Sequence, residues 1–149
     1  MFSSAAERVD RLVMPEFIFQ PRYVIKSVRN PDLDWLRDLI LEPFLPGREF
    51  GEAFIEYRDG QQSVSLILLS DRQLGYYLKH FLGKETWLSL GDAARLSEVV
   101  CPDDWEASAG LFVSPADAWS AIREFCLTGS RSSAIQWIRP SEVPPDGNR

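Results

Sequence analysis

The sequence has few of the side chains from which most metal and catalytic sites are built. It contains one histidine and two cysteines among 149 residues. A single histidine excludes a site with several histidine ligands and leaves one possible base for a catalytic triad. Cys101 and Cys126 are expected to stay free thiols, because we expect the chain to reside in a reducing compartment. We therefore expect neither a metal nor a cofactor.

Long apolar runs are also missing. The longest, Leu66 to Leu69, is far shorter than the ~20 residues of a membrane-spanning helix. Charged residues between Glu7 and Arg11 interrupt the apolar stretch that a secretory signal needs. These features predict a cytoplasmic protein without a membrane partner.

Basic side chains are outnumbered, with 16 Lys and Arg against 22 Asp and Glu, for a net charge of −6. Most of such a surface would repel a phosphate backbone, so we do not expect nucleic acid to bind directly. A basic protein is the better expected partner, because an acidic surface speeds its approach.

The order of the patterns predicts a single α+β domain over residues 1–139. Between residues 51 and 90, four short strand-like runs follow one another, with turn signals at Asp59-Gly60 and near Gly83, and they indicate an antiparallel meander. Residues 30–42 and 114–129 have helical patterns, and Leu33, Leu36 and Ile40 form the expected inward stripe of the first. Residues 3–13 could form a third helix, so two or three helices should pack on the sheet. The polar, proline-rich residues 140–149 predict a disordered tail.

The second helix has clear start and stop signals. Ser114 can cap its amino end, Pro115 suits the first turn, and Gly129 can take the left-handed conformation that ends a helix. The short polar stretch after Gly129 then leads into a strand that carries Trp137. This corner is explained by the fold alone.

His80 and Cys101 are the residues that could carry catalysis. In "YYLKHFL", His80 is expected to be a half-exposed residue of a strand. A Cys101 nucleophile with His80 as base is conceivable, but Asp103 and Asp104 beside the thiol would raise its pKa. We expect a binding protein rather than an enzyme.

Two tryptophans flanked by acidic residues are candidates for a protein-binding surface, since tryptophan is over-represented among interface hot spots. Trp105 could equally be a loop residue that packs back over the core, and both interpretations stay open. The preferred candidate surface consists of Asp103, Asp104, Trp105 and Glu106. The second consists of Asp32, Asp34 and Trp35.

The region from residue 50 to 138 carries an ordered set of motifs. A strand contains Gly-Tyr, Gly-Asp follows the next strand, and a helix of the form Ala-x-x-x-(aliphatic)-x-x-Phe-x-x-Thr-Gly leads into a strand that closes on Trp. This order resembles the Imm1 family of immunity proteins from bacterial polymorphic toxin systems. The matching positions are Gly75, Tyr76, Gly91, Asp92, Ala118, Ile122, Phe125, Thr128, Gly129 and Trp137.

The resemblance implies an immunity protein that binds a cognate bacterial toxin domain, a nuclease or nucleic-acid deaminase, and blocks it sterically. Such toxins usually carry basic substrate grooves, which agrees with the acidity of this chain. Two alternatives stay open: an adaptor or chaperone-like module that binds without inhibiting, and a small cysteine hydrolase.

Overall fold

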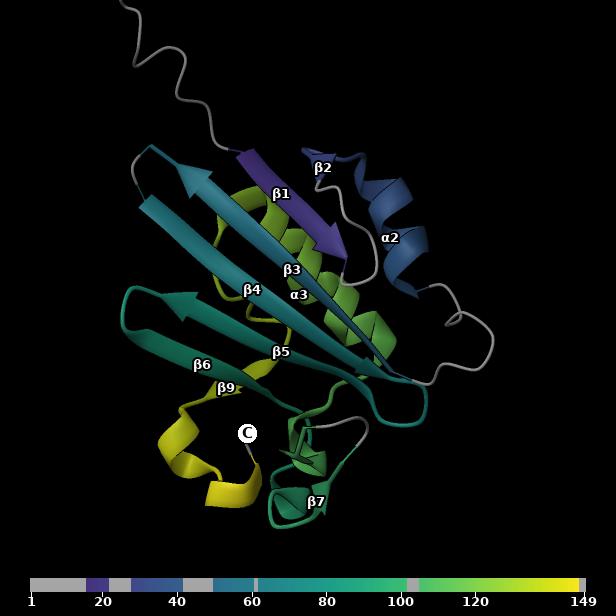
Figure 1. Ribbon diagram of the computed structural model, residues 1–149, viewed down its shortest axis with the longest axis vertical. Coiled ribbons are helices and arrows are strands. Elements are labelled where there is room, and N and C mark those ends of the chain that lie inside the picture. Colours follow the sequence, from purple (N-terminus) through teal and green to yellow (C-terminus); the bar gives the residue numbers. More distant parts are fainter. Residues whose placement is uncertain (1–15, 22–27, 42–49, 61, 102–104, 148–149) are drawn as a thin grey trace, which may run out of the picture.

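The computed structural model describes residues 16–21, 28–41, 50–60, 62–101 and 105–147. Within these ranges the chain forms one large antiparallel sheet, a two-stranded ribbon and two α-helices (Figure 1). The strands are β1 (Glu16–Pro21), β2 (Val28–Arg29), β3 (Phe50–Asp59), β4 (Gln62–Asp71), β5 (Gly75–Leu82), β6 (Glu85–Leu90), β7 (Val99–Val100), β8 (Ala107–Ser108) and β9 (Gln136–Ile138). The helices are α2 (Leu33–Leu41) and α3 (Pro115–Thr128). Short 3-10 helices occupy Ala93–Arg95, Ala109–Leu111, Pro140–Glu142 and Pro145–Gly147.

In the described part of the chain the large sheet has seven strands in the order β2-β1-β3-β4-β5-β6-β9. Its five central strands, β1 to β6 without β2, lie side by side in chain order, as in a meander. The predicted α+β class with an antiparallel meander is confirmed. Strand β9 returns from beyond α3 to pair with β6, with Leu88 opposite Ile138.

Two hairpins fix the register of the central strands. The β3–β4 hairpin closes at the pair Asp59 and Gln62, and Gly60 has a φ of 66°. The turn therefore begins one residue later than predicted, because Asp59 pairs in the ladder and the positive φ falls on glycine. The β5–β6 hairpin turns at Gly83, whose φ is 59°.

Helix α3 has the ends that the sequence predicts. Ser114 Oγ accepts a hydrogen bond from the Asp117 amide at 3.2 Å, and Gly129 stands at a φ of 74° with its amide donating to the Phe125 carbonyl at 2.7 Å. The buried side of α3 packs on one face of the sheet (Figure 1). This contact forms the larger of two cores, which includes Ile55, Leu66, Leu68, Leu78, Ala118, Ala121, Ile122 and Phe125.

Helix α2 lies beside α3 and adds to the same core. Its Leu36 is fully buried, and Leu33 and Ile40 pack partly against the core, which confirms the predicted inward stripe. The hydroxyl of Tyr76 donates a hydrogen bond of 2.5 Å to the Ile40 carbonyl. The backbone of Tyr76 also exchanges two hydrogen bonds with Val113, directly before α3.

A second core contains Leu69, Tyr77, Leu88, Leu111 and Phe112. Residues 140–147 pack against it, so the expected tail disorder is wrong for these residues. They form two 3-10 helices, and Val143 is only 7% exposed. The buried Val143 belongs to the second core, and Gly147 lies against Ser108 and Val143, so these contacts order a segment whose composition is largely polar.

In the part of the chain that the structure describes, no helix has the length and apolar character needed to cross a membrane.

Candidate functional site

The outer side of α2 exposes large apolar side chains. Trp35 is 46% exposed and Leu39 is 42% exposed. Because they are four residues apart on a helix, they lie next to each other on its surface, away from the buried Leu36. Burying such a pair against a partner would remove apolar area from water, so this face is suited to protein binding.

Acidic side chains surround this apolar pair. Asp32 caps the helix, since its Oδ2 accepts a hydrogen bond from the Trp35 amide at 3.1 Å. Asp34 and Asp38 are exposed, and Asp38 contacts Arg37 at 3.4 Å. We call the face formed by Asp32, Asp34, Trp35, Asp38 and Leu39 the α2 surface.

The structure thus brings together all three residues of the second surface predicted from the sequence. Asp38 and Leu39 were missed by the sequence reasoning, although each follows one of the predicted residues, Asp34 or Trp35, by four positions. That spacing was the available signal.

Trp105, from the preferred surface, is directed into the molecule. Its indole stacks on Phe112 with ring centres 6.3 Å apart at 19°, and it lies 6.4 Å from the ring of Tyr77. It is partly buried against the second core, as is expected of a loop residue that packs back over the core. Glu106 is partly buried, whereas Asp103 and Asp104 lie outside the described residues.

The two candidate surfaces lie in different parts of the molecule. In Figure 1, α2 is beside β2 at one side of the large sheet, whereas β7 is at the other end of the molecule, near β9. Strand β7 pairs with β8, which begins two residues after Trp105. They therefore do not form a single surface, and the exposure of Trp35 makes the α2 surface the better candidate.

His80 is buried, and the expectation of a half-exposed residue is wrong. It lies opposite Leu66 on the side of β5 that faces α3, and it is 2% exposed. Its Nε2 is 3.1 Å from the Gly129 carbonyl oxygen, to which the neutral ring can donate, and its ring meets those of Phe125 and Trp137 edge-on. Burial, assisted by the positive charge of Arg131, lowers the pKa of His80 despite its bond to Gly129.

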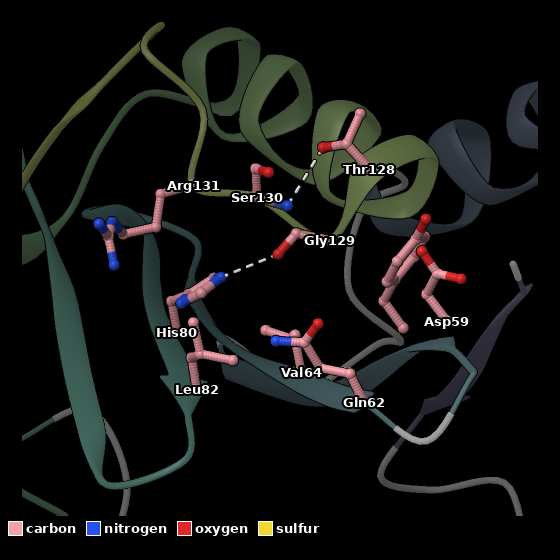
Figure 2. Close-up of a pocket in the computed structure, with 10 residues that line it drawn as sticks. Asp59, Gln62, Val64, His80, Leu82, Thr128, Gly129, Ser130 and Arg131 are labelled. Atoms are coloured by element: carbon pink, nitrogen blue, oxygen red, sulfur yellow. Dashed lines mark hydrogen bonds between the residues drawn. The ribbon is translucent and has the colours of Figure 1, made fainter.

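A cavity of about 340 Å³ adjoins His80 (Figure 2). Strands β3, β4 and β5 form its floor, and the end of α3 with the loop that follows forms its wall. Its lining residues are Tyr57, Asp59, Gln62, Val64, His80, Leu82, Thr128, Gly129, Ser130 and Arg131.

Cys101 and Cys126 do not form a disulfide with each other, as predicted. Cys126 is buried, and burial raises the pKa of its thiol to about 12. Cys101 is exposed and does not line the cavity beside His80, whose Nε2 is already engaged with Gly129. The described arrangement therefore does not bring Cys101 and His80 together as nucleophile and base.

Gly75 and Gly91 lie where backbones touch. A side chain at Gly75 would clash with the carbonyl oxygen of Val113, and one at Gly91 would clash with that of Phe112. The Gly91 amide donates to the Gly110 carbonyl at 2.8 Å. These two glycines therefore join β5 and β6 to the segment that enters α3, and their role is structural.

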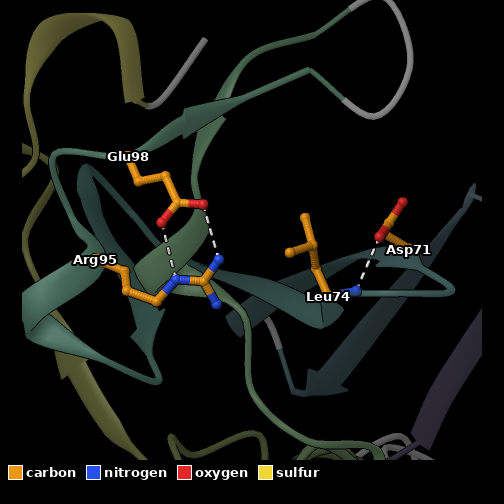
Figure 3. A network of polar contacts seen from close by, with 4 residues as sticks. All are labelled: Asp71, Leu74, Arg95 and Glu98. Carbon is orange, nitrogen blue, oxygen red and sulfur yellow. Dashed lines mark hydrogen bonds and ion pairs between the residues drawn. The ribbon is translucent and has the colours of Figure 1, made fainter.

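The polar groups drawn in Figure 3 satisfy one another. Two nitrogens of Arg95 donate to Glu98 at 3.0 and 2.8 Å, and these bonds lower the pKa of the Glu98 carboxyl. Asp71 accepts from the Leu74 amide at 2.9 Å and so holds the turn between β4 and β5. These pairs stabilise local turns and offer no further site.

Comparisons with protein-family models, with curated proteins and with solved structures found no match.

Proposed function

We propose that this protein is an immunity protein: a stoichiometric inhibitor that binds a cognate bacterial toxin domain, a nuclease or nucleic-acid deaminase, and blocks it sterically. The resemblance of residues 50–138 to the Imm1 family supports the class. The observation that carries the proposal is the α2 surface, where an exposed indole and an exposed leucine are surrounded by acidic side chains.

The chemistry of the α2 surface fits the demands of inhibition. Protection from a catalytic toxin needs a dissociation constant in the nanomolar range, equivalent to about −12 kcal/mol. An exposed ion pair contributes only about 0.2 to 1 kcal/mol, so the aspartates alone would be insufficient. Burial of Trp35 and Leu39 would provide most of the affinity, while Asp34 and Asp38 would direct and accelerate encounter with a basic groove.

The experiment is co-expression in a bacterium with the product of the gene beside this one. We expect growth to be rescued from the toxicity of that product, and we expect the two purified proteins to form a one-to-one complex. Improved solubility of the partner without rescue would favour a non-inhibitory adaptor. Rescue that persists without a complex would count against binding as the mechanism.

The α2 surface is tested within the same assay by Trp35→Ala, with Leu127→Ala as the matched control. Leu127 is 50% exposed on α3, so its truncation also removes an exposed apolar side chain. We expect the Trp35 variant to lose rescue and the Leu127 variant to retain it.

A further inference from the structure

The indole ring of Trp87 holds two arginine side chains. Trp87 lies on β6, and the guanidinium carbons of Arg131 and Arg139 are 4.2 and 4.7 Å from the centre of its ring. Because both distances are measured to the same point, the two cations are no more than about 9 Å apart, close to the screening length of physiological salt. We call Trp87, Arg131 and Arg139 the Trp87 cluster.

The Trp87 cluster is assembled from three parts of the chain. Arg139 directly follows β9, and the pairing of β9 with β6 brings it beside Trp87. Arg131 reaches the same ring from the loop after α3, and Figure 2 shows it on the side of the cavity away from Asp59. The cluster lies at the β9 edge of the large sheet, whereas α2 is beside β2 at the opposite edge. It is therefore separate from the α2 surface.

Neither arginine of the cluster has an acidic partner among the described residues. Carboxylates are plentiful in this chain, which has 22 acidic and 16 basic side chains. Those of two adjoining residues are engaged elsewhere: Glu85 Oε1 accepts from the Trp87 indole at 3.4 Å, and Glu142 Oε2 accepts from the Arg139 backbone amide at 3.0 Å. Two neighbouring positive charges are thus left without an ion-pair partner in the described part of the chain.

Unsatisfied buried polar atoms also gather around Trp87. Among the described residues, two buried side-chain nitrogens lack a hydrogen-bond partner. One is Nε of Arg139, which is an N–H donor. The other is Nδ1 of His80, the residue that pairs with Trp87 between β5 and β6. Because a buried polar group without a partner is costly, a polar ligand that approached this cluster would gain interactions that the fold itself does not make.

We infer that the Trp87 cluster binds a phosphate group, carried by inorganic phosphate or by a small phosphate monoester. A guanidinium that packs on an aromatic face keeps the N–H groups in its own plane available, and it can donate two parallel hydrogen bonds to a phosphate. A phosphate group at neutral pH carries close to two negative charges, which matches the two arginines. A carboxylate, with one charge, would compensate only one of them.

The test adds sodium phosphate to the whole protein at neutral pH and follows the indole N–H of Trp87 by NMR. Sodium chloride at the same ionic strength is the reference, because it screens the two cations without bridging them. We expect a saturable shift of the Trp87 signal with phosphate and none with chloride, while the exposed Trp35 on α2 shows no difference between the salts. Glycerol 2-phosphate is the second probe, and saturable binding of either compound supports the inference and identifies the source of the group.

Two variants assign the contacts. Arg131→Gln and Arg139→Gln should each weaken phosphate binding about tenfold, because each removes one bidentate, charge-assisted contact. Arg123→Gln is the matched control, since Arg123 is exposed on α3 outside the cluster, and it should leave binding unchanged.

The inference is overturned if neither phosphate compound shifts the Trp87 signal more than chloride does up to about 20 mM, or if both cluster variants bind phosphate as tightly as the unmodified protein. The comparison of salts needs no variant, so it is independent of any effect of substitution on folding. No toxin takes part in these experiments, and their failure would leave the proposed function untouched.

Discussion

Trp35 and Trp105 show how neighbouring sequence can mislead about exposure. Both are flanked by acidic residues, and the loop of Trp105 has the denser acidic cluster in the sequence. In the fold, Trp35 is on the exposed side of α2, and Leu36 is on the buried side of the same helix. Trp105, in contrast, packs on Phe112. Whether a residue is available to a partner thus depends on which side of its helix or strand it occupies, and not on the number of charged residues beside it in the sequence.

The largest effect that would test this comparison is on partner binding. Trp35→Ala combined with Asp34→Lys should weaken the toxin complex about a thousandfold, or ~4 kcal/mol, because it removes the aromatic anchor and reverses a charge. Both side chains are exposed, so the melting temperature should hardly change. Titration calorimetry with the toxin domain measures the loss, and an unchanged dissociation constant would remove α2 from the interface.

Truncation of the other tryptophan should act on folding instead. We expect Trp105→Ala to lower the free energy of unfolding by about 2 to 3 kcal/mol, since its indole fills space against Phe112 and Tyr77. Urea denaturation measures this change, and the folded variant should bind the toxin normally. If Trp105→Ala instead abolished binding at full stability, the roles that we assign to the two tryptophans would be reversed.

Acidic pH should destabilise the folded core through His80. His80 has a lower pKa in the folded protein than the ordinary value of 6.5. The unfolded chain therefore takes up its proton first, and stability should fall as the pH drops below 6.5, by at most about 1.4 kcal/mol per pH unit for this one proton. His80→Phe should flatten this slope in melting experiments between pH 7.5 and 5.5. An equal slope in both proteins would show that other groups cause it.

The smallest expected effect is on the rate of association. Asp34→Asn should slow toxin binding a few-fold at low salt and less at high salt, because screening weakens steering by exposed charges. Stopped-flow measurements with Asp117→Asn as control would test this, since Asp117 is exposed on the other helix. Equal slowing by both variants would mean that net charge, rather than the α2 surface, directs the encounter.

Local signals in the sequence predicted the elements that local interactions determine. The ends of α3 follow from Ser114, Pro115 and Gly129, each of which acts on its own helix turn. The central hairpins followed from alternation and glycine turns, to within one residue. The inward stripe of α2 was equally visible, because helical periodicity sets it.

Features that depend on distant contacts could not be predicted in the same way. The burial of His80 depends on which face of β5 receives α3, and the order of Val143 depends on a core assembled from β5, β6 and the segment before α3. The cavity needs the β3–β4 hairpin and the end of α3 to meet, so that Asp59 and Arg131, far apart in the sequence, line the same cavity. The spacing of residues in the sequence does not indicate which distant segments come into contact.

Tyr76 gives α2 a mechanical connection to the rest of the fold. Its hydroxyl donates a hydrogen bond to the Ile40 carbonyl near the C-terminal end of α2, and its backbone is hydrogen-bonded to Val113, two residues before α3. A force that a partner applied to α2 would thus be transmitted through Tyr76 to the sheet and to α3. The short helix would not detach from the rest of the protein by itself. The force needed to detach a partner bound to α2 would then depend on the stability of the whole fold and not on that of α2 alone.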